Sequence, residues 1–457
     1  MVSRMGRLEH GGGALSSSVL VGAALLSVAA SVDAQVLSRL CPCDVGELSV
    51  GAPVLHGLLS HSPSVDRPEL ARVEDGAVGF ARLGWSHESF DDTDGAGVRT
   101  LGYSASRLRL DAATALGDGG LVLRVERPAG EAHTGSDASS IYQALGTTYS
   151  LGASAEVGAS VTAGVAWDWG ETRIVDGRDV SPLWATADGG WRAGIVVRQG
   201  RGFYGVSMSL PRAAHRLCAD VGGLLLDSPL TSGGRSATAY AGWRRGETNW
   251  AVELRVSGMG TRQGRLVDAA GFDRGSVAAS TSSIGLIAAA RHASHSTEAT
   301  AELGVGMWQG AVEGELRTLP SPALLGGRYT LTGSLVAPWV HTSIGVRRSC
   351  GSRASVSGGI RADIAWPAGR VHLTDTGTLI VPPETVMRWD YTSAPGLLLT
   401  PTLGATCALG DAKLAAAIAW PLPMAPKAAY EYPPPTQPPR VPKSPPVVVS
   451  IEASVAF

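Results

Sequence analysis

Every second position is apolar along much of this chain. Between positions 159 and 169 the alternate residues are Ala, Val and Trp, and the residues between them are small or polar. The same period runs through 121–126, 250–257, 354–366 and 412–420. Side chains alternate across a strand, whereas helical spacing would scatter these apolar residues around a cylinder. The pattern therefore predicts an all-β chain whose strands each have one apolar face.

The last eleven residues show the same alternation up to the final aromatic residue. One face carries Val447, Val449, Ile451, Ala453, Val455 and Phe457. This segment resembles the closing strand of Gram-negative outer-membrane β-barrels of the porin-like class, in which such an ending is read by the barrel-assembly machinery. The resemblance implies an assembly signal at Val449, Ile451, Val455 and Phe457. A soluble edge strand can also alternate, so the rest of the chain must decide.

The N-terminal 34 residues are typical of a secretory signal peptide. Arg4 and Arg7 precede an apolar stretch at about 14–32, and small residues precede Gln35. A membrane-spanning helix is the alternative, but the many Ser, Ala and Gly residues favour a signal. We therefore divide the chain into a signal peptide at 1–34, a periplasmic extension or plug at 35–76, and a barrel at 77–457.

Connection lengths between the expected strands alternate between short and long. The short ones are 199–202, 244–248, 291–296, 349–353 and 410–411; the long ones are 170–189, 211–233, 259–276, 309–327, 367–396 and 422–446. Short periplasmic turns and long extracellular loops are typical of outer-membrane barrels. If 328–348 is one strand through Pro338, the pattern predicts a single antiparallel transmembrane barrel of about 16 strands, within a range of roughly 12–18.

Composition narrows the class of protein. Only 17% of residues are charged and the formal net charge is −2, which argues against a nucleic-acid partner. No second apolar run reaches the length of a spanning helix, which argues against an inner-membrane protein. Five cysteines do not make a disulfide scaffold. Cys41 and Cys43 precede the barrel, Cys350 falls in a predicted turn and Cys218 in a predicted outer loop.

Charged side chains opposite the apolar faces are expected to point into the barrel, because a basic residue facing lipid costs roughly 2–4 kcal/mol at the bilayer midplane. The predicted pore-lining residues are Arg124, Glu126, Asp168, Arg192, Glu253, Arg255, Glu302, Arg361 and Asp363. Two interpretations stay open: a polar channel that filters solutes by charge, or salt bridges that fill and stiffen the barrel.

Tryptophans cluster at the ends of the expected strands. Trp85, Trp167, Trp169, Trp191, Trp366 and Trp420 fall at the outer ends, and Trp243 and Trp250 fall at the opposite ends. Amphipathic rings prefer the boundary between membrane and water, so these residues predict two aromatic girdles.

Other motifs give no strong chemistry. His292, His295 and Glu298 have ligand-like spacing, but a polar turn is the favoured interpretation. The acidic stretch 87–94 is interpreted as a solvated loop, since it lacks the spacing of a calcium loop. No Gly-x-Ser-x-Gly motif is present. We therefore expect no catalytic residues, no enzymatic activity, no metal and no cofactor.

The sequence thus favours an outer-membrane barrel in contact with lipid and lipopolysaccharide, with the assembly machinery as a further partner. Passive diffusion of small solutes is the first function expected, because a barrel of 16 to 18 strands leaves an aqueous channel. A structural or adhesive barrel acting through its outer loops is the alternative, and an outer-membrane enzyme is a third. Assembly of several copies into a homo-oligomer is left open.

Overall fold

The fold is known from a computed structural model, which describes most of the chain between residues 55 and 457. The described residues are 55–59, 63–71, 79–93, 99–134, 142–176, 182–221, 224–261, 264–268, 273–317, 328–375, 384–392, 396–424 and 447–457. The predicted signal peptide and most of the Pro-rich stretch before the last strand lie outside these residues.

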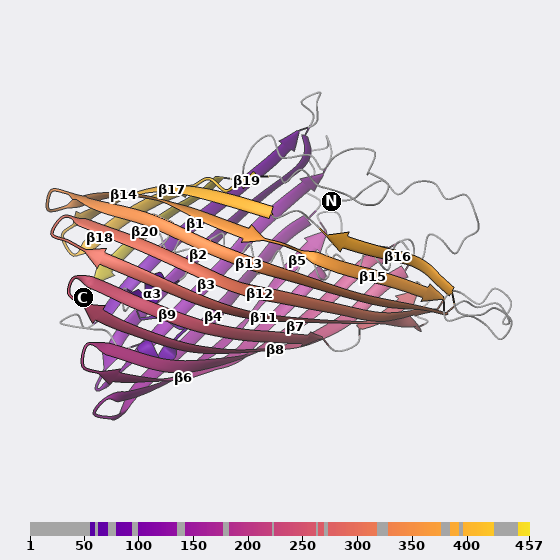
Figure 1. Ribbon diagram of the computed structural model, residues 1–457, viewed down its shortest axis with the longest axis horizontal. Coiled ribbons are helices and arrows are strands. Elements are labelled where there is room, and N and C mark those ends of the chain that lie inside the picture. Colours follow the sequence, from indigo (N-terminus) through magenta and orange to yellow (C-terminus); the bar gives the residue numbers. More distant parts are fainter. Residues whose placement is uncertain are drawn as a thin grey trace.

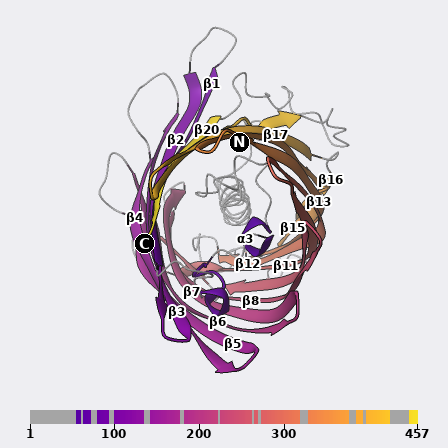
Figure 2. The same ribbon diagram turned by 90° about the vertical axis from the view of Figure 1, so that its left-hand side faces the viewer.

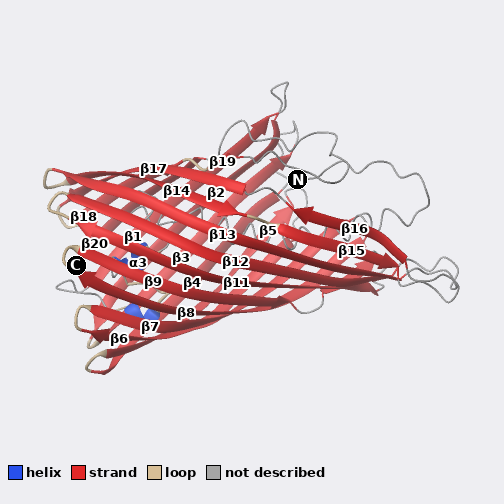
Figure 3. Ribbon diagram, in the orientation of Figure 1, coloured by secondary structure: helices blue, strands red, loops and turns tan. Residues whose placement is uncertain are grey.

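Nearly all described residues belong to strands (Figure 3). The strands are β1 (Gly79–Thr93), β2 (Arg99–Leu116), β3 (Gly119–Thr134), β4 (Tyr142–Gly158), β5 (Val161–Asp176), β6 (Pro182–Gln199), β7 (Gly202–Val221), β8 (Leu224–Arg245), β9 (Thr248–Thr261), β10 (Gly264–Asp268), β11 (Asp273–Ala293), β12 (Thr297–Arg317), β13 (Arg328–Cys350), β14 (Ala354–Ala365), β15 (Ala368–Asp375), β16 (Glu384–Thr392), β17 (Gly396–Leu409), β18 (Ala412–Ala419), β19 (Leu422–Met424) and β20 (Val447–Ala456).

These segments form a closed antiparallel barrel of 16 strands (Figures 1 and 2). Four of the 16 strands consist of two segments each: β9 with β10, β14 with β15, β16 with β17, and β18 with β19. The barrel closes where β1 pairs with β20. Gly79 and Phe457 exchange two backbone hydrogen bonds there, of 2.9 and 3.0 Å. Closure pairs the first strand with the last, as a sheet within lipid requires, although among the described segments β16 and β19 each pair on one side only. The predicted fold class is confirmed.

The two faces of the wall differ as the alternation predicts. Leu254 and Ile360 are 42% and 47% exposed on the outside, whereas their neighbours Glu253 and Arg361 are 0% and 6% exposed on the inside. On β7 the exposed residues are Tyr204, Val206, Met208 and Leu210. An apolar exterior with a polar interior is the arrangement of a barrel that spans a membrane.

Short turns join the strands at one end of the barrel, where the C-terminus also lies (Figure 1). The predicted short connections at 199–202, 244–248, 291–296, 349–353 and 410–411 all contain one of these turns. Gly246 and Gly410 open two-residue turns with φ of 62° and 64°, a conformation that favours glycine and permits a tight hairpin.

The predicted long loops are largely wrong, because the strands continue through most of them. β5 ends at Asp176 and β6 begins at Pro182, within the predicted loop 170–189. β7 and β8 likewise cover most of 211–233, and strands cover much of 259–276, 309–327 and 367–396. Paired strands that extend beyond the apolar band need no apolar face, so their sequences do not alternate clearly. For the same reason Cys218 lies in β7, and the predicted acidic loop at 87–94 lies in β1 as far as Thr93.

Strand 328–348 does run unbroken through Pro338, as predicted, and the neighbouring strand breaks instead. β14 ends at Ala365 and β15 begins at Ala368. Trp366 donates its backbone N–H to the Pro338 carbonyl at 3.0 Å. Pro338 has no N–H to return, so the ladder is interrupted on the partner strand.

Two short helices lie inside the barrel, α3 (His56–Leu59) and the 3-10 helix η1 (Pro68–Leu70) (Figure 2). We call the described residues around them, 55–59 and 63–71, the lumen segment. It belongs to the region predicted as an extension or plug at 35–76, and the first strand of the barrel begins at Gly79. Among the described residues, no helix is both long and apolar enough to cross a membrane.

Candidate functional site

The first half of the lumen segment is held by apolar contacts. Leu55, Leu58 and Leu59 are at most 1% exposed and pack with residues of β6, β8, β9 and β11. Burial of a leucine side chain stabilises by about 2 kcal/mol. Asn249 adds a polar contact by donating its side-chain N–H to the Leu59 carbonyl at 3.3 Å. Residues 55–59 therefore form a firm attachment to the inner wall.

The second half approaches the wall so closely that two inner positions must be glycine. A Cβ added at Gly164 on β5 would lie 2.2 Å from the Glu69 backbone nitrogen. A Cβ added at Gly194 on β6 would lie 2.4 Å from the Glu69 carboxyl carbon. Glycine permits this approach because it has no Cβ. The wall is thus shaped to receive η1.

Arg67 connects the segment to β9 and β8. Its guanidinium forms an ion pair with Glu253, which is fully buried and also pairs with Arg255 at 2.7 Å. The same guanidinium lies 5.3 Å from the centre of the Tyr240 ring. A buried carboxylate needs such partners, since an unpaired one would be strongly destabilising.

Glu69 is fully buried between the segment and the wall. Tyr240 donates its hydroxyl proton to Oε1 at 2.5 Å, whereas Oε2 has no hydrogen-bond partner among the described residues. Burial raises the pKa of Glu69, and the bond from Tyr240 and the nearby Arg67 charge only partly oppose that rise. The contact with the wall therefore favours a protonated Glu69.

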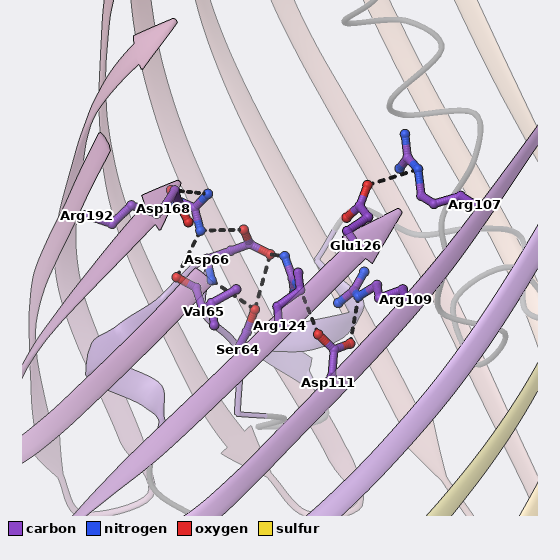
Figure 4. A network of polar contacts seen from close by, with 10 residues as sticks. All are labelled: Ser64, Val65, Asp66, Arg107, Arg109, Asp111, Arg124, Glu126, Asp168 and Arg192. Atoms are coloured by element: carbon purple, nitrogen blue, oxygen red, sulfur yellow. Dashed lines mark hydrogen bonds and ion pairs between the residues drawn. The ribbon is translucent and has the colours of Figure 1, made fainter. Parts of the chain in front are cut away.

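Asp66 lies in a network of charges on β2, β3, β5 and β6 (Figure 4). Arg124 reaches Oδ2 of Asp66 at 2.8 Å, and Arg192 reaches Oδ1 at 3.1 Å. Partial desolvation against the wall by itself would raise the pKa of Asp66, but the charges of Arg124, Arg192 and Arg109 outweigh that effect and hold the pKa below its ordinary value. Asp66 is therefore ionised at neutral pH.

A second network links the start of the segment to β12, β13 and β14. Leu55 donates its backbone N–H to Glu302 at 2.7 Å. Glu302 lies 2.6 Å from Nε2 of His341, whose Nδ1 lies 2.9 Å from Asp363. Arg361 completes the chain by donating to both oxygens of Asp363, at 2.7 and 3.0 Å. Both ring nitrogens of His341 face carboxylates, an arrangement that suits a doubly protonated ring.

The nine predicted pore-lining residues all lie on the inner wall, in three groups. Arg124, Glu126, Asp168 and Arg192 belong to the network around Asp66. Glu253 pairs with both Arg67 and Arg255. Glu302 and Asp363 contact His341, and Arg361 pairs with Asp363. Their role in lining a pore stays a prediction. The structure shows that their partners include the lumen segment as well as one another.

Sequence reasoning missed the residues of the lumen segment itself and two wall residues, Tyr240 and His341. The run Asp66-Arg67-Pro68-Glu69 places three charges in a stretch without strand alternation, which was a usable signal. His341 falls on the inward register of the strand 328–348, where a titratable side chain indicates a polar contact. Tyr240 gave no comparable signal.

Of the eight predicted interface tryptophans, Trp85, Trp167, Trp191, Trp243, Trp250 and Trp366 are more than a third exposed. The predicted placement at strand ends is wrong for Trp85, Trp167, Trp169 and Trp191, because β1, β5 and β6 continue well past them. Trp167 and Trp191 lie opposite one another on β5 and β6. This pair and the Trp243–Trp250 pair are stacked, with ring centres 5.6 and 6.4 Å apart.

The two pairs lie at different heights of the wall. Trp243 is beside Gly202 of β7, and Trp191 is beside Leu210 of the same strand. At 3.4 Å per residue these levels are about 27 Å apart along β7. With a strand tilt of about 40°, that is about 20 Å along the barrel axis, near the height of a lipid-facing band. Their place at the membrane boundary stays a prediction.

The metal-like motif does not converge among the described residues. His292 lies near Thr248 and Glu247, at 3.0 and 3.8 Å, whereas Glu298 pairs with Arg291 at 3.0 Å. Within the described part of the chain, no group of three His, Cys, Asp or Glu residues is arranged to hold a metal ion. Cys350 and Cys407 are exposed thiols.

No protein-family model matches the chain, and no curated protein matches it. Among solved structures, the chain is similar to a mutant of the TodX monoaromatic hydrocarbon channel, with a TM-score of 0.43, 11% identity and coverage of 90% of this chain and 98% of that one. The siderophore receptor PirA from Acinetobacter baumannii gives a TM-score of 0.40 and 10% identity, covering 78% and 64%. OmpT of Vibrio cholerae, as a loop deletion mutant, gives 0.33 and 10%, covering 83% and 100%. The architecture described above rests on the chain's own strand pairing.

Proposed function

We propose that this chain is an outer-membrane channel for passive diffusion of small polar solutes, and that residues 63–71 act as an internal gate. The observation that carries the proposal is the charged inner wall, whose side chains bind a separate segment of the chain. A barrel of this strand number leaves an aqueous lumen unless something fills it. Here the lumen segment occupies part of that space, so we expect solute flow to depend on its position.

The two halves of the segment suit different roles. Residues 55–59 are attached through three buried leucines, whose burial stabilises by about 2 kcal/mol each. Residues 63–71 are held through the polar contacts of Asp66, Arg67 and Glu69, and also through Val65 and Ala71, which pack against Ala113 and Val122 of the wall. These polar contacts respond to salt, pH and competing ions, whereas the apolar contacts do not. We therefore expect 63–71 to move while 55–59 stays attached.

Planar-bilayer recording tests the proposal. A release variant, Asp66→Ala with Arg67→Ala, should conduct more than the native chain. The matched control is Arg388→Ala with Asp390→Ala, which removes an exposed Arg–Asp pair of β16 and should leave conductance unchanged. Folded native protein and folded release variant that both stay silent would reject the channel and favour the structural or adhesive role.

We propose that the chain is not an enzyme, although His87 Nδ1 lies 2.9 Å from the Ser106 hydroxyl. A serine-type site needs an imidazole nitrogen free to take a proton from the nucleophile. Both nitrogens of His341 are instead engaged by Glu302 and Asp363.

A further inference from the structure

The charged network around Asp66 is balanced only because Asp66 is there. The wall contributes four arginines, Arg107, Arg109, Arg124 and Arg192, and three carboxylates, Asp111, Glu126 and Asp168 (Figure 4). Within this network the wall therefore has one positive charge in excess. Asp66 of the lumen segment supplies the fourth carboxylate. A wall that needs a negative charge from elsewhere is a candidate site for an anion.

The geometry at Asp66 is that of a bound carboxylate. Arg124 contacts one carboxylate oxygen at 2.8 Å, and Arg192 contacts the other at 3.1 Å. Charge-assisted contacts of this kind are stronger than neutral hydrogen bonds. Each oxygen thus has its own arginine.

The two arginines are also held by the wall without Asp66. Arg124 donates from Nε to Asp111 at 2.9 Å, and Arg192 pairs through Nη2 with Asp168 at 2.7 Å. Arg109 anchors the far oxygen of Asp111 at 2.6 Å. The site would therefore persist when Asp66 moves away, because its side chains stay positioned by their own partners.

The site has an open side. The Asp66 side chain is 57% exposed, while Arg124 and Arg192 are 12% and 23% exposed. A solute in the lumen can thus approach from the side of the carboxylate. Asp66 is presented by a small turn, in which its backbone N–H donates to the Ser64 hydroxyl at 3.1 Å. It is a tethered occupant, which competes with free ligands at a high effective concentration.

We propose that Arg124 and Arg192 form a binding site for the carboxylate of a small solute, and that Asp66 occupies this site in the structure as an internal competitor. A solute carboxylate that displaces Asp66 removes one of the polar contacts of residues 63–71 and so favours the open gate. The gating half of this inference rests on the proposed channel function; the binding half does not.

Acetate is the matched probe, since it has the carboxylate and single carbon of an aspartate side chain. Its binding to the folded full chain in detergent can be followed by NMR titration with carbon-13 acetate, at constant ionic strength in chloride. Asp66→Ala should bind acetate at least about tenfold more tightly than the native chain, because the tethered competitor is gone. Asp66→Asn, which keeps the size of the side chain, should show the same direction.

Adding Arg192→Gln to Asp66→Ala should abolish this gain, whereas adding Arg388→Gln on β16 should not. Equal affinity in the native chain and in both folded Asp66 variants would overturn the proposal. Tight binding that survives Arg192→Gln would overturn it as well.

The two proposals fail separately. If folded protein never conducts but Asp66→Ala binds acetate tightly, the channel is rejected and the carboxylate site stands. If the release variant conducts but neither Asp66 variant gains affinity for acetate, the channel stands and the site is rejected.

Discussion

Two Arg–Asp pairs with the same spacing differ in burial, which gives a direct test of what the inner wall contributes to stability. Arg361 contacts Asp363 at 2.7 Å with 7% of its side chain exposed, and Arg388 contacts Asp390 at 2.8 Å with 64% exposed. Removing one partner of a buried pair costs about 3 kcal/mol or more, whereas an exposed pair contributes about 0–1 kcal/mol.

We therefore expect Arg361→Gln to lower the free energy of unfolding by about 3 kcal/mol, and Arg388→Gln by less than about 1 kcal/mol. Urea unfolding of the barrel in lipid vesicles measures both. Equal effects would show that Arg361 is hydrated in the lumen. The sequence predicted Arg361 as a pore-lining residue, but its burial and its pairing with Asp363 indicate that substitution will first affect stability.

Glu69 predicts a pH dependence of the gate. The pKa of Glu69 is raised when residues 63–71 are docked, so the docked segment holds this proton more tightly than the released segment does. Docking is therefore strongest below the ordinary pKa of a glutamic acid and weakens as the pH rises through the docked pKa. Asp66, whose pKa is lowered, stays ionised over the same window and contributes no slope.

Conductance should accordingly fall as the pH is lowered from neutral toward the ordinary glutamic acid value. Glu69→Gln mimics the protonated side chain, so its conductance should be low and should lack this slope. The difference between the two proteins isolates Glu69 from His341 and the other lumen groups. A slope of the same size in Glu69→Gln would assign the pH dependence elsewhere.

At the scale of elements, the glycines of β5 and β6 determine whether η1 can dock. A methyl group at Gly164 would collide with the backbone at Pro68 and Glu69, which a side-chain rotation cannot relieve. Gly164→Ala should therefore release residues 63–71 without changing any charge. Gly258→Ala on β9 is the control, because its added Cβ would meet nothing closer than 3.9 Å.

The readout is the accessibility of position 65, which is 2% exposed in the docked segment. With the native cysteines replaced by serine, Val65→Cys should react slowly with a hydrophilic thiol reagent, and quickly once Gly164→Ala is added. Slow labelling in both backgrounds would show that the segment accommodates the methyl group and that the wall does not select for glycine.

The wall was predictable from the sequence, whereas what occupies the lumen was not. Alternation with a period of two places Leu254 and Glu253 on opposite faces of the strand, because the outer face must be apolar throughout the lipid-facing band. The prediction of long loops was wrong where strands such as β7 extend beyond the lipid-facing band. There no face must be apolar, so the sequence does not alternate. Glu69 and its partner Tyr240 are 171 positions apart, and only the closed barrel brings them together. No local pattern encodes such a contact.

For the whole molecule, Phe457 both closes the barrel and presents its side chain outward. Its backbone makes two hydrogen bonds with Gly79, and the residue is 62% exposed. Phe457→Ser keeps the backbone bonds, so a loss of assembly in this variant would come from the missing aromatic signal. We expect a reduced amount of heat-modifiable barrel in the outer-membrane fraction, with secretion unchanged. Native levels of assembled Phe457→Ser would show that the ring is not read.

The most direct test of the gate is a reversible lock between the segment and the wall. A Cβ at Gly194 would lie 2.4 Å from the carboxyl carbon of Glu69, so we expect Glu69→Cys and Gly194→Cys to form a disulfide once the longer side chain is removed. The pair is introduced into a chain with no other cysteine, together with Asp66→Ala and Arg67→Ala.

Single-channel conductance is then recorded before and after adding a reductant, with the disulfide verified by gel mobility. We predict low conductance while the disulfide holds η1 against β6, and a rise in conductance when the disulfide is reduced in the same membrane. Conductance that is unchanged on reduction of a verified disulfide would contradict the account, because the position of the lumen segment would then have no influence on flow through the barrel.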